Sequence, residues 1–242
     1  MINKETEQNT VLQKKDKEAS TQKQCKIYII NSSPRKGRNT DEMCKSFKKG
    51  VENAGGEGKI IYLNDLIFKG CRECFACKLK NGKNYGKCAF SDEITPILND
   101  ISHSDGIVFA TPIFFGDASG VMKSFAERLL FPYIRYDKDF TSIAPKRLRT
   151  AVIYTMNVTK EIFENDYLRA DNSGQLGLFE SWIEKVFEKP ERICAHNTYQ
   201  FSDYDKYDAE IWDANDKEWQ RQNVFPKDLK NAYEAGKRMA SI

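Results

Sequence analysis

The chain has 242 residues, which is enough for one domain of ordinary size with extensions. Its formal net charge is only +3, with acidic and basic residues interspersed, so composition gives no reason to expect nucleic acid or a membrane as a partner. No apolar stretch approaches the roughly 20 residues of a membrane span. The N-terminus lacks the apolar core of a signal peptide, and seven cysteines without an export signal indicate a reducing compartment. We therefore expect a cytoplasmic protein.

The segment 1–24 is polar, so it cannot bury enough apolar surface to offset its ordering entropy, and we expect a disordered leader there. From residue 25 onward, short apolar runs alternate with helical patterns. The expected strands lie at 27–30, 59–63, 106–110, 151–154 and 192–195. Such alternation forms βαβ units around a parallel sheet. We expect one α/β domain over 25–242, doubly wound, with five parallel strands in the flavodoxin-like order 2-1-3-4-5 and helices on both faces.

The loop after the first strand has the chemistry of an anion site. It leads into a helix, where free backbone N–H groups and the helix dipole face a ligand. Its polar groups are the hydroxyls of Ser32, Ser33 and Thr40, the amide of Asn39 and the guanidinium of Arg35. The simpler alternative is an ordinary connection in which Asn39 caps the helix, with Glu42 three residues on. The spacing fits neither a dinucleotide fingerprint nor a P-loop.

The loop after the third strand supplies apolar and aromatic groups. It comprises Thr111, Pro112, Ile113, Phe114, Phe115 and Gly116. In the expected strand order, the loops after the first and third strands meet at the switch point where α/β sheets bind ligands. Gly116 would let the backbone approach a flat ring that Phe114 and Phe115 cover, although both phenylalanines also suit a plain core. A phosphate at one end and a flat heterocycle at the other describe flavin mononucleotide (FMN).

These two loops resemble those of NADPH-dependent FMN reductases. The match in the first loop is Ser-x-Arg-x-x-x-Asn-Thr, at Ser33, Arg35, Asn39 and Thr40, and in the second it is 111–116, where Phe114 stands in place of the usual Tyr. The resemblance implies a flavodoxin-like fold, FMN, electrons from NAD(P)H or a reduced ferredoxin-like protein, and a homodimer or higher homo-oligomer. Together with fold position, it also places Thr155, Met156 and Asn157 beside the flavin.

A cysteine-rich loop spans 71–88. Cys71, Cys74 and Cys77 form Cys-x2-Cys-x2-Cys, which narrows the resemblance to iron-sulfur flavoproteins, and Cys88 is the nearby candidate for a fourth ligand. Such a run wraps three thiolates around a [4Fe–4S] cluster. Ten residues separate Cys77 from Cys88, a longer gap than the compact motif usually shows. Zinc with four thiolates and metal-free thiols stay open as alternatives.

These features favour an oxidoreductase that passes electrons from NAD(P)H or a reduced protein through FMN, with or without a [4Fe–4S] cluster, to a small-molecule or protein acceptor. One alternative is an electron carrier or redox-sensing module without substrate turnover. Another is a flavodoxin-like protein with a structural zinc site. The sequence shows no arrangement of catalytic acid–base residues, so we assign none. The aromatic insertion 199–225 is expected either as an arm that covers a neighbouring subunit or as a flap over its own domain.

Overall fold

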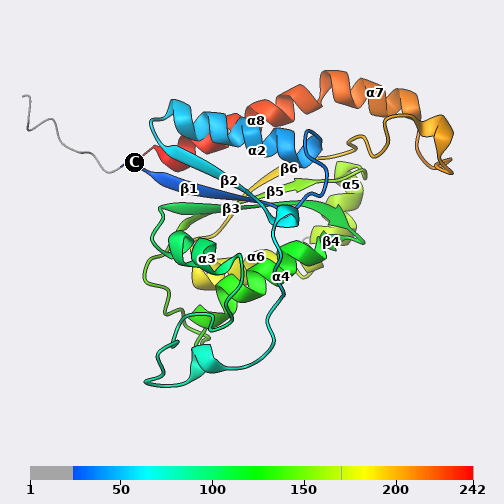
Figure 1. Cartoon of the computed structure of the whole chain (residues 1–242). Coiled ribbons are helices and arrows are strands. Elements are labelled where there is room, and N and C mark those ends of the chain that lie inside the picture. Colours follow the sequence, from blue (N-terminus) through cyan, green and yellow to red (C-terminus); the bar gives the residue numbers. More distant parts are fainter. Residues whose placement is uncertain (1–23, 170, 242) are drawn as a thin grey trace, which may run out of the picture.

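The computed structural model describes residues 24–169 and 171–241 (Figure 1). The leader expected at 1–24 lies outside the described residues except for Gln24. The strands are β1 (Lys26–Asn31), β2 (Glu57–Tyr62), β3 (Gly106–Phe114), β4 (Asp117–Ala118), β5 (Arg149–Thr155) and β6 (Glu191–Ala195). The α-helices are α2 (Asn39–Asn53), α3 (Thr95–Ser102), α4 (Gly120–Leu130), α5 (Lys160–Ile162), α6 (Gln175–Val186), α7 (Ala214–Asn223) and α8 (Phe225–Ala240).

The strand order confirms the expected fold. Five parallel strands run β2-β1-β3-β5-β6, which is the flavodoxin-like order once the short β4 is set aside. The described residues add β4 as a sixth strand, which pairs antiparallel with the end of β3. A strand of two residues carries too little periodicity to be predicted from its sequence.

The third strand is longer than the expected 106–110. It continues through Pro112, which lies opposite Thr155 of β5. The pairing of β3 with β1 ends at Ala110, so Pro112 has a strand partner on the β5 side alone and is tolerated there. The segment expected as a loop is therefore partly strand, and this fixes the direction in which it leaves the sheet.

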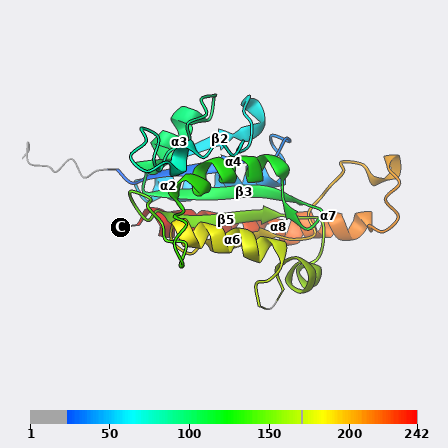
Figure 2. The ribbon, with the colours of Figure 1, turned by 90° about the horizontal axis from the view of Figure 1, so that it is seen from below.

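The helices cover both faces of the sheet. Figures 1 and 2 show α2, α7 and α8 on one side and α3, α4 and α6 on the other. Helices α2 and α8 approach so closely that a Cβ atom at Gly50 would lie 1.9 Å from the Tyr233 carbonyl oxygen. A Cβ at Gly236 would lie 2.1 Å from the Phe47 carbonyl oxygen. Glycine at both positions is therefore a condition of this packing.

Each face of the sheet has its own apolar core. Met43, Phe47 and Val51 of α2 are fully buried on one side, as the helical pattern predicts. On the other side, α6 buries only part of its apolar surface. Ile183 and Val186 are buried, but Trp182 is 44% exposed and packs edge-on against Phe140. None of the helices formed by the described residues is long and apolar enough to cross a membrane.

Candidate functional site

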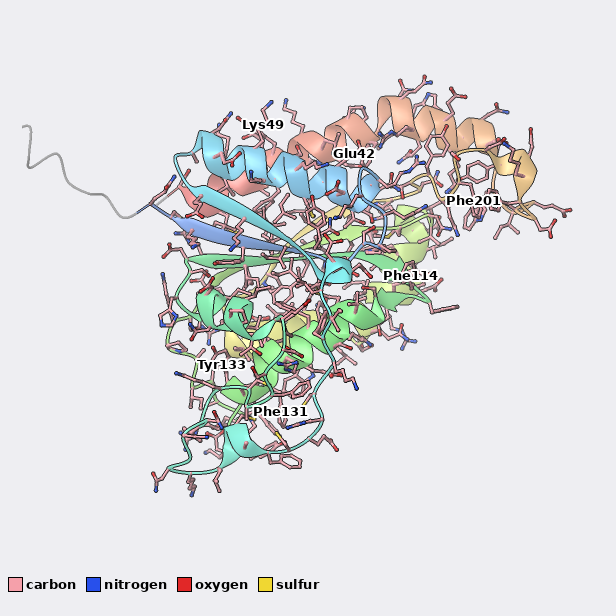
Figure 3. The ribbon with its side chains drawn as sticks, in the orientation of Figure 1. Glu42, Lys49, Phe114, Phe131, Tyr133 and Phe201 are labelled. Carbon is pink, nitrogen blue, oxygen red and sulfur yellow. The ribbon has the colours of Figure 1, made fainter. Side chains whose placement is uncertain are left out.

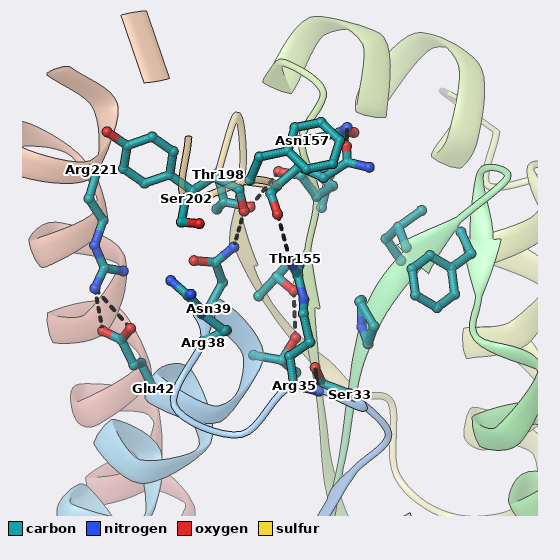
Figure 4. Close-up of a pocket in the computed structure, with 18 of the residues that line it drawn as sticks. Ser33, Arg35, Arg38, Asn39, Glu42, Thr155, Asn157, Thr198, Ser202 and Arg221 are labelled. Atoms are coloured by element: carbon teal, nitrogen blue, oxygen red, sulfur yellow. Dashed lines mark hydrogen bonds and ion pairs between the residues drawn. The ribbon is translucent and has the colours of Figure 1, made fainter. Parts of the chain in front are cut away.

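A cavity of about 890 Å³ lies at the carboxyl ends of β1, β3 and β5 (Figure 4). This is the edge at which open α/β sheets bind ligands. It is lined by eleven of the fourteen residues expected to bind the cofactor: Ser33, Arg35, Asn39, Thr40, Pro112, Ile113, Phe114, Phe115, Thr155, Met156 and Asn157. The structure thus brings the three expected loops together around one space.

The first loop is held in shape by a buried carboxylate that the sequence did not single out. Asp41 accepts hydrogen bonds from the Gly37 backbone N–H (2.7 Å) and the Tyr62 hydroxyl (2.8 Å), and it pairs with Lys45 at 2.8 Å. Gly37 has a φ of +72°, which favours glycine in this turn. Burial raises the pKa of Asp41, but these bonds outweigh burial and lower the pKa overall. Burial and the neighbouring Asp41 carboxylate raise the pKa of Tyr62 to about 12.

Three of the expected residues, Ser32, Thr111 and Gly116, do not line the cavity. The buried Ser32 hydroxyl donates to the Ala110 carbonyl and accepts from Ser119 at 2.8 Å. The Thr111 hydroxyl is buried too and accepts the Ser119 backbone N–H at 3.0 Å. These bonds tie β1, β3 and the start of α4 together. The role of Ser32 and Thr111 in the structure is therefore to hold the two loops in register.

Gly116 also has a different environment from the one expected. Its φ is +75°, and an added Cβ would lie 3.0 Å from the ring of Tyr167. The turn conformation and the tyrosine both favour glycine at this position, and the close approach of a flavin ring stays a prediction.

The first helix is not capped as the simpler alternative proposed. Arg38 occupies the N-cap position and forms no capping hydrogen bond with its side chain within the described residues. The Asn39 amide instead donates to the Tyr199 carbonyl at 2.8 Å, and Glu42 pairs with Arg221. Both side chains of the expected cap therefore reach across to the insertion.

The insertion folds over its own domain, in line with the flap alternative. Arg35 donates to the Gln200 carbonyl at 2.6 Å, and the Asn157 amide bonds the Gln200 side chain. Thr40 and Thr155 share a hydroxyl hydrogen bond of 2.7 Å beneath this contact. The expectation that the segment covers a neighbouring subunit stays a prediction, since no second copy is present.

Phe114 and Phe115 are not core residues. Phe114 is 49% exposed and Phe115 is fully exposed, and both line the cavity. Thr155 and Met156, from the neighbouring strand β5 and the loop after it, also line the cavity and are buried. The cavity therefore offers aromatic faces at one end and a loop of hydroxyls and arginine at the other, a donor set that fits a flat ring bearing a phosphate.

A buried lysine fixes the loop after β5. Lys217 of α7 is 1% exposed, donates to the Asn157 carbonyl at 2.6 Å and also bonds the Asn197 side chain. Burial lowers the pKa of Lys217 to about 8. Nothing in the sequence pattern distinguished this lysine from the exposed lysines around it.

Nine further lining residues were not among the expected ligands. They are Arg38, Glu42, Thr198, Tyr199, Gln200, Phe201, Ser202, Tyr207 and Arg221. Most belong to the insertion, whose aromatic content marked it as an interaction segment without showing its partner. Its contact with the first loop joins residues more than 150 positions apart, such as Arg35 and Gln200.

The four expected metal ligands share a second, much smaller cavity of about 20 Å³. Cys71, Cys74, Cys77 and Cys88 all line it. Cys77 is buried and Cys74 exposed, and the pKa of Cys74 is lowered chiefly by a hydrogen bond from the Ala76 backbone N–H. Within the described residues, no three metal-ligating side chains are grouped to hold a metal ion. The donor chemistry therefore fits a thiolate site, but these thiols are not gathered around one ion.

A buried arginine closes the loop that carries these cysteines. Arg128 donates from Nε to the Cys88 sulfur at 3.0 Å and forks onto Asp92 at 2.7 and 3.1 Å. Its remaining bonds go to the carbonyls of Lys69 and Phe90. Arg128 thus holds both ends of the cysteine loop.

Comparison with known proteins agrees with this geometry. Residues 25–144 match the model of the NADPH-dependent FMN reductase family. An iron-sulfur flavoprotein of Archaeoglobus fulgidus is 37% identical over 103 residues, which cover 43% of this chain and 48% of that protein. An iron-sulfur flavoprotein of Methanocaldococcus jannaschii is 30% identical over 103 residues, which cover 43% of this chain and 51% of that protein. The chain therefore spans about half the length of these curated relatives.

Two solved structures share the fold. The NAD(P)H:quinone oxidoreductase of Methanothermobacter marburgensis superposes with a TM-score of 0.63 at 12% identity, over 89% of this chain and 99% of that one. An FMN-dependent NADH-azoreductase of Bacillus anthracis in complex with FMN superposes with a TM-score of 0.62 at 14% sequence identity. The match covers 89% of this chain and 99% of that one. At these identities the likeness concerns the fold. Over residues 25–144 the chain belongs to the NADPH-dependent FMN reductase family, as the two loops predicted.

Proposed function

We propose that this protein is an FMN-dependent oxidoreductase that takes electrons from NAD(P)H or a reduced ferredoxin-like protein and delivers them to a small-molecule or protein acceptor. The observation that carries the proposal is the single cavity in which Ser33, Arg35 and Thr40 meet the exposed Phe114 and Phe115. This set suits a phosphate at one end and a flat ring at the other. Family membership over residues 25–144 supports the same cofactor.

The protein's part in the reaction is to bind and orient the cofactor. Bound FMN would supply the hydride and single-electron chemistry. The hydroxyls of Ser33 and Thr40 and the guanidinium of Arg35 would bind its phosphate at the N-terminus of α2, where the helix dipole favours an anion. Thr155–Asn157 would flank the ring, and Lys217 holds that loop in place through the Asn157 carbonyl. The described lining contains no histidine, cysteine or lysine, and we assign no acid–base residue.

We also propose that Cys71, Cys74, Cys77 and Cys88 hold a [4Fe–4S] cluster. Their shared cavity and the relatives named iron-sulfur flavoprotein support this, while zinc and metal-free thiols are the competing outcomes. Measuring iron, zinc and acid-labile sulfide in anaerobically purified protein separates the three. A cluster requires iron and sulfide in the parent protein and their loss in Cys74→Ser, with FMN retained.

Three measurements test the flavin assignment and its alternatives. Purified protein should bind FMN, and Arg35→Ala should weaken binding by roughly 10- to 100-fold, because a hydrogen bond to a charged group contributes about 1.5–3 kcal/mol. Steady oxidation of NADPH or NADH distinguishes an enzyme from an electron carrier. Oxidation driven only by reduced ferredoxin would assign the donor to a protein.

We further propose a cytoplasmic homodimer or higher homo-oligomer. Light scattering on the full chain and on a variant lacking residues 203–223 tests whether the insertion takes part. An unchanged oligomer in the shortened variant would leave the insertion as a flap alone.

A further inference from the structure

The cavity extends beyond the loop 31–40, here called the phosphate loop, into a compartment that the flavin assignment does not use. This compartment is formed by the start of α2 and the insertion, and it contains Arg38, Arg221, Ser202, Phe201 and Tyr207. Figure 4 shows Arg38, Ser202 and Arg221 on the far side of Asn39 from Arg35 and Ser33. Phe114 lies at the end of β3, and Figure 3 shows it apart from Phe201, which belongs to the insertion. The cavity therefore reaches from the end of β3 to the insertion.

The compartment has an uncompensated positive charge. The Arg38 side chain lines the cavity, and among the described residues it has no hydrogen-bond or ion-pair partner. Arg221 donates from one guanidinium nitrogen, Nη2, to both carboxylate oxygens of Glu42 at 2.8 Å. Two arginines and one glutamate give a local charge of +1. Since an arginine fork suits phosphate, Arg38 is a free anion donor beside an arginine that is already held in place.

The compartment also has an aromatic platform. The rings of Phe201 and Tyr207 are stacked with centroids 4.0 Å apart and planes inclined by 13°. Tyr204 braces Phe201 edge-on at 5.4 Å, and Tyr207 is 53% exposed. Parallel aromatic rings that border a cavity are the surfaces on which nucleobases stack.

We propose that this compartment binds the adenosine-phosphate half of a dinucleotide, with the phosphate at Arg38 and the base on the Phe201–Tyr207 stack. The inference rests on the proposed function only in placing the flavin ring at the other end. The volume of about 890 Å³ lies near the upper end of the roughly 300–1,000 Å³ of ligand cavities, so a ligand longer than a mononucleotide has room.

Two kinds of dinucleotide contain an adenosine-phosphate half and could bind here. One is FAD, whose flavin would take the Phe114 end in place of FMN. The other is the NAD(P)H that donates electrons to bound FMN. The chemistry that the compartment recognises, a phosphate ester beside an adenine, is the same in both, and the choice between them is experimental.

The test uses 5′-AMP as the probe, titrated calorimetrically into flavin-free and FMN-loaded protein. AMP should bind at least one form, and adenosine should bind more weakly. Phe201→Ala should lower AMP affinity by about tenfold or more, and Arg38→Ala by about 10- to 100-fold. Arg135→Ala, which removes an exposed arginine outside the cavity, is the matched control and should change nothing.

The source of the nucleotide follows from which form binds AMP. Binding to the flavin-free form alone, together with tighter binding of FAD than FMN, identifies FAD. Binding to the FMN-loaded form, with competition against NADPH, identifies the electron donor. In both cases Phe201→Ala should leave FMN affinity within about twofold, because its ring lies beyond the phosphate loop.

The inference is overturned if AMP binds neither form at millimolar concentration while FMN binds normally. It is also overturned if Phe201→Ala and Arg38→Ala bind AMP as the parent does. Protein that binds AMP in this compartment but does not bind FMN would contradict the proposed function and leave the inference standing.

Discussion

Replacement of Asp41 by asparagine tests how the phosphate loop is held in shape. The carboxylate of Asp41 is buried and accepts the Gly37 N–H at 2.7 Å and the Tyr62 hydroxyl at 2.8 Å. Hydrogen bonds to a charged group contribute about 1.5–3 kcal/mol each. Asparagine keeps one acceptor oxygen, so one bond is lost and the other becomes neutral. We expect Asp41→Asn to lower the free energy of unfolding of the flavin-free protein by about 2–4 kcal/mol at pH 7.

The pH dependence of this loss has a definite sign. The folded protein lowers the pKa of Asp41 below its ordinary 3.8, so the carboxylate contributes stability above that pH. The contribution is lost as pH falls through the lowered folded value. Urea unfolding should therefore show a constant gap between parent and variant from pH 6 to 8, and a shrinking gap below about pH 4.

Lys45→Gln is the matched control for Asp41→Asn. The Lys45 side chain is 57% exposed, so loss of that i,i+4 pair should cost no more than about 0.5 kcal/mol. Equal stability of Asp41→Asn and the parent at pH 7 would refute the reasoning. A gap that persists undiminished at pH 2 would refute the assignment of the effect to the carboxylate charge.

Three further predictions concern other buried groups. Arg128→Met should cost about 3–5 kcal/mol in urea unfolding, because it leaves Asp92 without its buried partner, and a loss below 1 kcal/mol would contradict that role. Burial raises the pKa of Asp228 to about 6, so Asp228→Asn should stabilise the protein by about 1–3 kcal/mol at pH 7.5. The gain should vanish near pH 4, where both folded and unfolded parent approach the protonated form, and a gain at pH 4 would contradict this cause. Gly236→Ala should lower the melting temperature by several degrees, since its Cβ would meet the Phe47 carbonyl, and an unchanged melting temperature would show that α8 can shift.

The local patterns of the sequence were enough to predict the scaffold and the two main loops. The apolar run 27–30 forms a strand where expected. Met43, Phe47 and Val51, which share one face of α2, are buried as the 3.6-residue period of a helix requires. The position of Ser33 and Phe114 at one cavity then follows from the strand order.

The remaining features depend on contacts that no local pattern records. Whether Ser32 points into the cavity or behind it is decided by Ser119, 87 residues further along the chain. The insertion carries aromatic residues suited to any interface, and only its bonds to Arg35 and Asn39 show that it closes over its own domain. Arg128 likewise cannot be recognised from its neighbours in the sequence. It holds the cysteine loop through hydrogen bonds to Cys88 and Asp92, which lie 40 and 36 residues earlier in the chain.

Titration of flavin-free protein with FMN, followed by flavin fluorescence, tests the central claim most directly. Riboflavin, which lacks the phosphate, and the Arg35→Ala variant serve as comparisons. The structure predicts tight binding of FMN by the parent, much weaker binding of riboflavin, and a loss of about 10- to 100-fold for FMN in Arg35→Ala. Equal affinity for FMN and riboflavin, or an Arg35→Ala variant that binds FMN as the parent does, would contradict a phosphate site at the 31–40 loop.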